Sequence, residues 1–552
     1  VTRISSLGGD CMNIWARIKR FFRKGGAKLG MGEYKSLRAI TDDPRIKVPA
    51  EEYERIRKAK NYYQDNLPQV DYYAMGNKCK RKLNSINVTK MASRRLASLI
   101  FNEQCAIKVD DSQLQDILDT ILKRENFYTT FETELEKWIA LGSGSVRPYV
   151  EDDKVKLSYA DADDVYPLNS NTIKVDEIAL SRRIRKIENN EAVYYTLLEF
   201  HQWGSNKEVD DQGNVYRPYT ITNELYRSGD SNNIGELVPL NSIDEYADLQ
   251  PQSTFQHLEK PLFAFYRNAG ANNKSLTSPL GLGLCDNYWH TVDDINATHD
   301  GFAWDVKTGY RRITIPRTWV RRQEQINGKP LPEASQLYWD PKDAVFVPIN
   351  ARADDSSSFK DLAIQIRTEQ YTASMDFFLH EFENEVGLSQ GTFTTSPSGV
   401  QTATEVVTNN SMTYQTRSSY LTQVEKMIDQ LVYAIAELLQ TPDVWSDQQA
   451  RWSGDIDKLT ITPDFNDGVF VDQEAQRQSD LQAVQAGILP KKQFLMRNYN
   501  LDENTADQWL SEIQDEQSPE PPEQEMSMFP SEGGVASDRS RDNASPDDGE
   551  SK

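Results

Sequence analysis

Residues 278–306 read SPLGLGLCDNYWHTVDDINATHDGFAWDV, and this stretch decides how the rest of the chain is organised. Its apolar side chains recur at steps of 4, 4, 3, 4, 3 and 4, which is the spacing of one buried stripe on a helix. The stripe consists of Leu284, Tyr288, Val292, Ile295, His299, Phe302 and Val306. The spacing therefore predicts a helix over 284–306 that follows a glycine-containing turn.

A second helix is predicted where apolar residues return at steps of 4, 3, 4 and 4. These residues are Tyr371, Met375, Phe378, Phe382 and Val386, and Gly387 directly after them is a natural residue to end a helix. Over 307–366 the helical period is absent. Turns that contain Pro and Gly alternate there with short strand signals at 313–316, 337–339 and 344–349. The pattern predicts two helices that enclose a small β-rich insertion.

The residues before this segment change period once. Residues 50–140 are predicted to be mainly helical, because apolar residues recur at helical spacing, as at Leu114, Leu118 and Ile121. Gly142-Ser-Gly144 breaks that pattern. Alternation of apolar and polar residues then predicts strands at 146–150, 154–159, 194–203 and 215–226. We therefore predict an α+β block with one antiparallel sheet.

The residues after the second helix are again mainly helical. Loop 389–401 carries no charged residue, and Thr402-Ala-Thr-Glu405 has the capping-box pattern that begins a helix. A long helix is expected to continue to Thr441-Pro442, followed by a strand at 459–462 and two or three short helices in 472–515. From Glu516 the composition is rich in Pro, Ser, Asp and Glu, which predicts disorder. We find no internal repeat of 20–50 residues.

Composition narrows the class of protein. The 552 residues include 62 Lys and Arg against 84 Asp and Glu, a net charge of −22, with 38% hydrophobic residues. A sizeable core can therefore form, whereas binding of nucleic acid over the whole surface would need clustered cations. No apolar window is long enough to span a membrane. The four cysteines are far apart, as in a reducing cytoplasm: Cys11, Cys79, Cys105 and Cys285.

The first 30 residues carry seven basic side chains and one acidic side chain, Asp10. Residues 12–24 can form an amphipathic helix on a membrane surface or on a partner. The interpretation we favour is a mobile basic arm that ends at Gly25-Gly26. No apolar segment of a secretory signal follows the basic residues. Val1 can stand for an alternative start codon, or translation can begin at Met12.

The chain offers little for catalysis. A Walker loop, GxSxG, HExxH, a complete GxGxxG after a strand and paired Cys/His ligands are all missing from the sequence. Of the five histidines, His290 lies four residues before Asp294, so a metal pair is geometrically possible. We favour a packed His299 and a surface His290 instead. We predict no enzyme, no cofactor and no metal site.

One charge cluster remains. Between Val306 and Lys329 a single acid, Glu324, accompanies seven cations: Lys307, Arg311, Arg312, Arg317, Arg321, Arg322 and Lys329. These cations are suited to contact phosphates or an acidic partner protein. A solvated β-rich surface that is basic by composition explains them equally well, and the two interpretations stay open here.

The order of these parts resembles the portal proteins of tailed bacteriophages, and is most similar to those of long-tailed phages of Gram-positive bacteria. Four stretches carry the resemblance. They are Leu141-Gly-Ser-Gly144 before paired strands, Ser278-Pro-Leu-Gly281 before the 284–306 helix, Gly387-Leu-Ser389 before Thr402–Val406, and Ile461–Gly468 with Gly487–Pro490 and Glu503–Glu512. Together they cover about residues 30–515.

The resemblance implies an α+β, mainly helical portal-type subunit. Its expected parts are a basic N-terminal arm (1–30), a wing (31–280 and 404–465), a first stem helix (281–305), a clip (306–366), a second stem helix (367–388), a tunnel loop (389–403), a helical crown (466–516) and a disordered acidic tail (517–552). It also implies a ring, normally of twelve subunits, in the virion at the portal vertex and in the host cytoplasm during assembly.

The resemblance also implies partners and site residues. The expected partners are double-stranded DNA without sequence specificity, the terminase large subunit, major capsid and scaffolding proteins, and head-completion or adaptor proteins. The tunnel-loop residues expected to face DNA are Gln390, Gly391, Thr392, Thr394, Thr395, Ser396, Ser398, Gly399 and Gln401. Those of the clip, expected to contact terminase, connector or DNA, are Arg311, Arg312, Arg317, Arg321 and Arg322.

The first stem helix is expected to present an acidic face formed by Asp286, Asp293, Asp294 and Asp300. Such a face would repel the DNA backbone and so favour sliding over binding. Two other functions compete with the portal interpretation. One is an uncharacterised metal-dependent hydrolase that uses His290 or His299. The other is a membrane-surface scaffold bound through the 12–24 helix.

Overall fold

A computed structural model describes most of residues 36–517. Within that span it leaves out 75–76, 103–104, 171–173, 211–212, 310–312, 317–324, 327–328, 331–345, 350–359, 361–364, 395–410, 466–472, 500 and 502. The chain divides into two compact units, Val1–Phe470 and Val471–Lys552. Both helices and strands are present, so the α+β prediction is confirmed at this level.

Four helices form the first part of the larger unit, as predicted: α1 (Ala50–Tyr63), α2 (Val88–Ile100), α3 (Ser112–Arg124) and α4 (Phe127–Leu141). Helix α4 buries Phe127, Phe131, Leu135 and Trp138 on one stripe at helical spacing. A hairpin of β2 (Val70–Ala74) and β3 (Asn77–Arg81) lies between α1 and α2. We did not predict this hairpin.

The larger sheet has seven strands in the order β1-β13-β12-β9-β8-β7, with β14 also paired to β12. The strands are β1 (Ser36–Leu37), β7 (Val165–Ser170), β8 (Val175–Glu188), β9 (Glu191–Trp203), β12 (Tyr219–Ser228), β13 (Gly235–Val238) and β14 (Gln252–Phe255). Predicted strands 194–203 and 215–226 correspond to β9 and β12. Strand β8 was missed because Arg and Lys residues occupy much of its outer half.

A second sheet of three strands, β15-β5-β6, makes the prediction of a single sheet wrong. It consists of β5 (Ser143–Glu151), β6 (Lys154–Asp161) and β15 (Ala264–Arg267). Every residue of β5 is buried. The two sheets are joined by an ion pair in which Arg147 Nε lies 2.9 Å from Glu199 Oε1. Both side chains are buried, so this pair belongs to the core.

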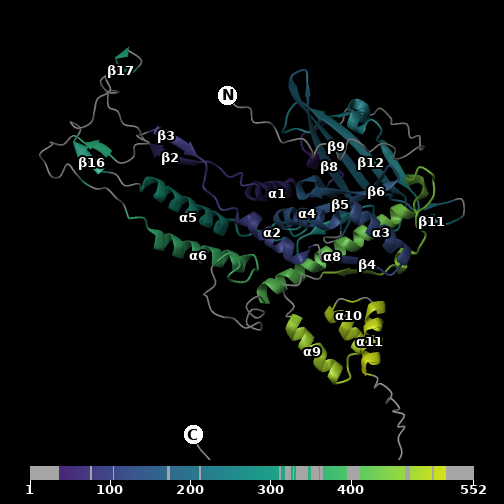
Figure 1. Ribbon diagram of the computed structural model, residues 1–552. Coiled ribbons are helices and arrows are strands. Elements are labelled where there is room, and N and C mark those ends of the chain that lie inside the picture. Colours follow the sequence, from purple (N-terminus) through teal and green to yellow (C-terminus); the bar gives the residue numbers. More distant parts are fainter. Residues whose placement is uncertain are drawn as a thin grey trace, which may run out of the picture. The chain divides into compact units, whose positions relative to one another are not determined.

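The two predicted helices around the β-rich insertion are present as α5 (Trp289–Thr308) and α6 (Thr368–Glu385). They lie side by side and run in opposite directions (Figure 1). Arg367 at the start of α6 accordingly pairs with Asp305 near the end of α5 at 2.7 Å. Gly387, with a φ of +73°, ends the second helix as predicted. The first helix begins later than predicted, at Trp289, because residues 284–287 form turns.

The described part of the insertion contains short strands only. Strand β16 (Ile313–Pro316) pairs in parallel with β19 (Phe346–Ile349), and both were predicted. Strands β17 (Gln325–Ile326) and β18 (Lys329–Pro330) form a small antiparallel ladder. The predicted strand 337–339 lies outside the described residues.

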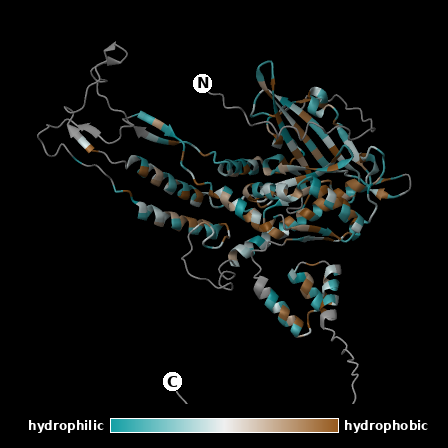
Figure 2. Cartoon of the chain, in the orientation of Figure 1, coloured by the Kyte–Doolittle hydropathy of each residue, from teal (hydrophilic) through white to brown (hydrophobic). Residues whose placement is uncertain are grey.

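Helix α8 (Ser411–Gln440) runs along the interior of the larger unit and packs on β5 and β15. Hydrophobic residues are concentrated along it in Figure 2. It ends at Thr441-Pro442, as predicted. Strand β20 (Ile461–Asp464) follows and pairs with β4 (Ala106–Val109), while β10 (Glu208–Val209) pairs with β11 (Val215–Tyr216). The predicted capping box at 402–405 lies outside the described residues.

The described part of the smaller unit contains three short helices, which confirms the prediction for 472–515. They are α9 (Gln473–Gln485), α10 (Lys491–Tyr499) and α11 (Glu503–Gln517). Helix α10 packs against both others. Lys492 of α10 holds two carboxylates of α11, Glu503 and Asp507, each at 2.8 Å. The acidic tail beyond 517 lies outside the described residues.

Glu437 is an acid on the buried side of α8. Its Oε1 accepts hydrogen bonds from the backbone N–H groups of Glu259 at 2.7 Å and Lys260 at 2.6 Å. Burial raises the pKa of Glu437 to about 7, although these two bonds act to lower it. Between the usual pKa of glutamate and about 7, the folded state therefore binds a proton that the unfolded state has released.

The substitution Glu437→Gln tests this assignment. The free energy of unfolding of the wild type should fall by up to about 3 kcal/mol as pH rises from about 4.5 to 7, because ionisation of Glu437 costs more in the folded state. In the variant this part of the fall should be missing, since glutamine does not ionise. Denaturant titrations of both proteins at pH 5 and pH 7.5 measure the difference. Equal pH dependence in both would contradict the assignment.

Candidate functional site

The start of the α5–α6 pair is fixed by a close approach of two backbone segments. Gly281 N–H donates to Ser143 Oγ at 2.9 Å, and Asn268 N–H donates to the Gly142 carbonyl at 2.9 Å. A Cβ atom at Gly281 would collide with that same Gly142 carbonyl oxygen. Glycine is therefore required at 281, because only a hydrogen atom fits between the two chains.

A buried charge network holds the same turn. The Arg55 guanidinium of α1 pairs with Asp286, lies 3.2 Å from Glu52, and donates to the Gly281 carbonyl at 3.0 Å. Asp286 also accepts the Gly283 N–H at 2.7 Å. Burial raises the pKa of Asp286, and Arg55 lowers it. This network ties α1 to the segment that leads into α5.

Glu52 extends the network to the turn before Gly281. Its Oε2 accepts hydrogen bonds from Asn272 Nδ2 at 2.7 Å and Ser278 Oγ at 3.0 Å. All three side chains are buried. Ser278, predicted only as part of a turn, is therefore one of the groups that fix where the helix pair begins.

We expect Arg55→Met to destabilise the protein by about 3–5 kcal/mol, because Asp286 and Glu52 would be left buried without their cation. The matched control is Arg57→Met on the same helix. Arg57 is exposed and lies 4.0 Å from Glu54, so its loss should change stability by less than about 0.5 kcal/mol. Denaturant titration measures both variants. Equal stability of the two would show that the network is not needed.

The acidic face predicted for the first helix is only partly present. Asp286 lies before α5 and is buried, and Asp300 is buried by the β2–β3 hairpin. Arg81 grips Asp300 with two bonds of 2.5 and 2.6 Å, which lower the pKa of that carboxyl. Asp293 and Asp294 are exposed, as predicted. The prediction is therefore wrong for Asp286 and Asp300, whose cation partners come from distant parts of the sequence.

The residues after α6 fold back onto a buried carboxylate. Glu383 Oε1 accepts the backbone N–H groups of Phe393 at 2.6 Å and Thr394 at 3.2 Å, and its Oε2 accepts that of Gly391 at 3.3 Å. Thr394 is itself only 9% exposed. Of the predicted DNA-facing residues, Thr394 is thus unsuited to that role in this structure. Gln390 is exposed, and Gly391 and Thr392 are half-buried.

The two ends of the loop are clasped together. Ser389 N–H donates to Thr413 Oγ1 at 2.8 Å, and Thr413 N–H donates to Ser389 Oγ at 3.2 Å. Both residues are buried. The predicted loop residues Thr395, Ser396, Ser398, Gly399 and Gln401 lie outside the described residues. Glu383 was not predicted from the sequence, where its only signal is an acid directly after Phe382 of the apolar stripe.

We expect Glu383→Gln to speed amide hydrogen exchange in residues 389–394 by about tenfold, because one charged acceptor is lost. The control Glu381→Gln changes an exposed acid two residues away and should leave exchange there unchanged. Hydrogen-exchange mass spectrometry of the peptide covering 389–394 makes the comparison. The same exchange rates in both variants would contradict the role given to Glu383.

In the described part of the chain, the remaining predicted site residues do not form a second candidate site. All five clip arginines lie outside the described residues. His290 is exposed, whereas His299 is half-buried and its Nδ1 lies 2.9 Å from the Asn84 carbonyl oxygen. In the described part of the chain, no three His, Cys, Asp or Glu side chains gather as metal ligands would. None of the described helices combines the length and apolarity needed to cross a membrane.

A Tyr–His–Glu chain in the sheet has the order of a catalytic relay. Tyr219 Oη lies 2.9 Å from His201 Nδ1, and His201 Nε2 lies 2.6 Å from Glu199 Oε1. All three residues are buried, and burial lowers the pKa of His201. With its ring in the core, this chain is a structural network that holds β9 and β12 together.

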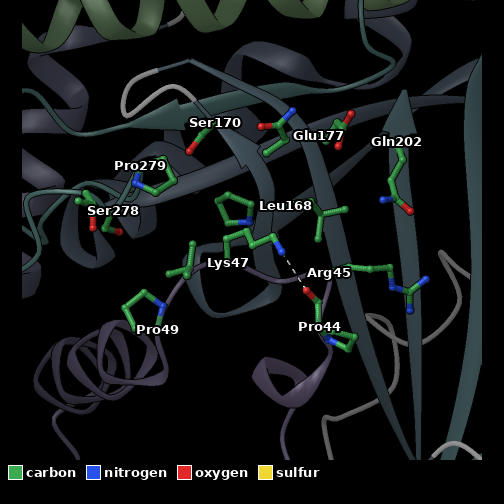
Figure 3. Close-up of a pocket in the computed structure, with 14 residues that line it drawn as sticks. Pro44, Arg45, Lys47, Pro49, Leu168, Ser170, Glu177, Gln202, Ser278 and Pro279 are labelled. Carbon is green, nitrogen blue, oxygen red and sulfur yellow. Dashed lines mark hydrogen bonds between the residues drawn. The ribbon is translucent and has the colours of Figure 1, made fainter. Parts of the chain in front are cut away.

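A cavity of about 680 Å³ lies where the turn around Pro44–Pro49 meets the ends of β7, β8 and β9 (Figure 3). Proline and polar side chains line it, and Lys47 Nζ donates to the Pro44 carbonyl at 3.2 Å. Its one carboxylate, Glu177, accepts the Trp203 N–H at 3.2 Å. Among the lining residues no nucleophile is paired with a histidine, so the cavity does not have the groups of a hydrolytic site.

A comparison with known protein families gives a match. A family model described as phage portal protein, SPP1 Gp6-like, matches residues 43–519. This range begins before α1, ends after α11 and covers parts of both compact units. No curated protein matches the chain.

Proposed function

Because this chain belongs to the SPP1 Gp6-like family of phage portal proteins, we propose that it forms a DNA conduit at the capsid portal vertex in which its parts have different roles. The match over 43–519 is the observation that carries this conclusion, since it covers most of the chain. The family is structural rather than catalytic. ATP hydrolysis for packaging would then belong to a separate terminase motor.

The proposed ring contains twelve subunits around a central tunnel for double-stranded DNA. We assign the wing to 31–280 and 404–465, the stem to 281–305 and 367–388, the clip to 306–366 and the crown to 466–516. The antiparallel α5–α6 pair with a β-rich insertion supports this division. Capsid and scaffolding proteins would contact the ring at the vertex, and head-completion proteins would bind after packaging.

In this proposal the tunnel surface has a low affinity for DNA. Each phosphate that a protein neutralises adds salt-dependent affinity. A protein surface along which DNA slides should therefore carry few cations. Residues 389–401 contain no charged side chain, and the exposed Asp293 and Asp294 would repel the backbone. The clasp of Ser389 and Thr413 supports a loop that is anchored at both ends and reaches DNA with residues between them.

Substitution of arginines in the proposed clip tests whether this segment docks the packaging motor. In Arg321→Glu/Arg322→Glu, two cations of the basic segment become acids, which should weaken contact with an acidic motor surface or with DNA. We expect rings to form normally and packaged DNA to fall at least about tenfold. Ring formation is followed by light scattering and packaging by nuclease-protected DNA. Normal packaging by this variant would contradict the assignment.

A further inference from the structure

Helix α2 carries a cationic face in an acidic chain. We define this face as Lys90, Met91, Arg94 and Arg95, which are all exposed. Residues 72–102 contain no Asp or Glu, although the whole chain has a net charge of −22. Within the described residues no carboxylate forms an ion pair with the three cations. The opposite side of α2 packs on α4. Lys90 Nζ lies 5.6 Å from the centre of the Tyr63 ring, whereas the described residues form no ion pair with Arg94 or Arg95.

Met91 indicates what kind of partner the cationic face would bind. Its side chain is 47% exposed and lies among the three cations. A phosphate backbone needs cations and gains nothing from a thioether. Arg and Met are both enriched at protein–protein interfaces relative to the rest of the protein surface. The composition therefore favours an acidic protein surface with an apolar group at its centre.

Helix α6 presents a surface of that kind. Its acidic face consists of Asp376, Phe377 and Glu381. Phe377 is 63% exposed, with acids one residue before it and four residues after it. The other side of α6 packs on α5, so the acidic face is left open. A thioether against an aromatic ring is a favourable contact.

We propose that the cationic face of α2 in one subunit docks on the acidic face of α6 in the next subunit. Neighbours in a ring meet through two different surfaces, and these faces match in charge and in their apolar centre. Both faces are exposed in the described part of the single subunit. The inference rests on the proposed ring and names the residues that would close it.

Three variants test the pairing. Arg94→Glu/Arg95→Glu reverses the cationic face, and Asp376→Lys/Glu381→Lys reverses the acidic face. Each alone should reduce ring formation at least about tenfold, because like charges then oppose each other at every interface. The control Lys123→Glu/Lys426→Glu makes the same charge change as the first variant at exposed positions on α3 and α8, and should assemble normally.

Mixing the two face variants provides the decisive experiment. Each interface in an alternating ring pairs two reversed faces or two wild-type faces, so an equimolar mixture should form rings again. Light scattering gives the mass, and circular dichroism of the unassembled variants verifies their folding. Failure of the mixture to assemble would overturn the proposal, as would normal rings from either variant alone.

The alternative is that the cationic face of α2 binds the DNA backbone, and this alternative predicts a different result. Arg94→Glu/Arg95→Glu would then assemble as well as the control but retain less DNA, which would also overturn the pairing. The proposed function fails in a distinguishable way, because wild-type protein would then form no rings at all.

Discussion

The structure depends on one buried contact, the grip of Arg55 on Asp286 beside the close approach of Gly281 to Gly142. It joins α1, the start of β5 and the turn before α5 at a single point. Buried charges are costly unless paired, so the network has few alternative arrangements that satisfy it. The direction in which α5 leaves the sheets is thereby fixed, and α6 follows because it packs along α5. The positions of the β-rich insertion and of the loop after α6 therefore also depend on this contact.

A second group of buried contacts holds the loop after α6. Glu383 captures three backbone N–H groups after α6, and Ser389 with Thr413 closes the loop across its ends. In the proposed tunnel, a loop without cations would contact DNA without binding it tightly, since residues 389–413 contain no Lys or Arg. The acids Asp293 and Asp294, which are exposed on α5, would act in the same direction. These features are consistent with the proposed role as a DNA conduit.

Local periodicity predicted the elements with clear amphipathic stripes, namely α5, α6 and α8, with the exact ends confirmed at Gly387 and at Thr441. Strand β8 and the β2–β3 hairpin were missed because charged side chains interrupt their alternation. The acids Asp286 and Asp300 were misjudged for another reason. Their partners, Arg55 and Arg81, are more than 200 residues away in sequence, and no local pattern indicates such pairs. Glu383 was missed likewise, since its partners are backbone groups that become available only when the chain turns back.

We propose that this chain forms a ring with a DNA tunnel bounded by the α5–α6 pairs and the loop between α6 and α8. Electron cryomicroscopy of the purified protein tests this proposal. We predict a closed ring of about twelve subunits, with residues 395–401 at the narrowest part of the central hole. A stable monomer or dimer over a range of salt concentrations, or a ring with this loop on its outer surface, would show that the proposal is wrong.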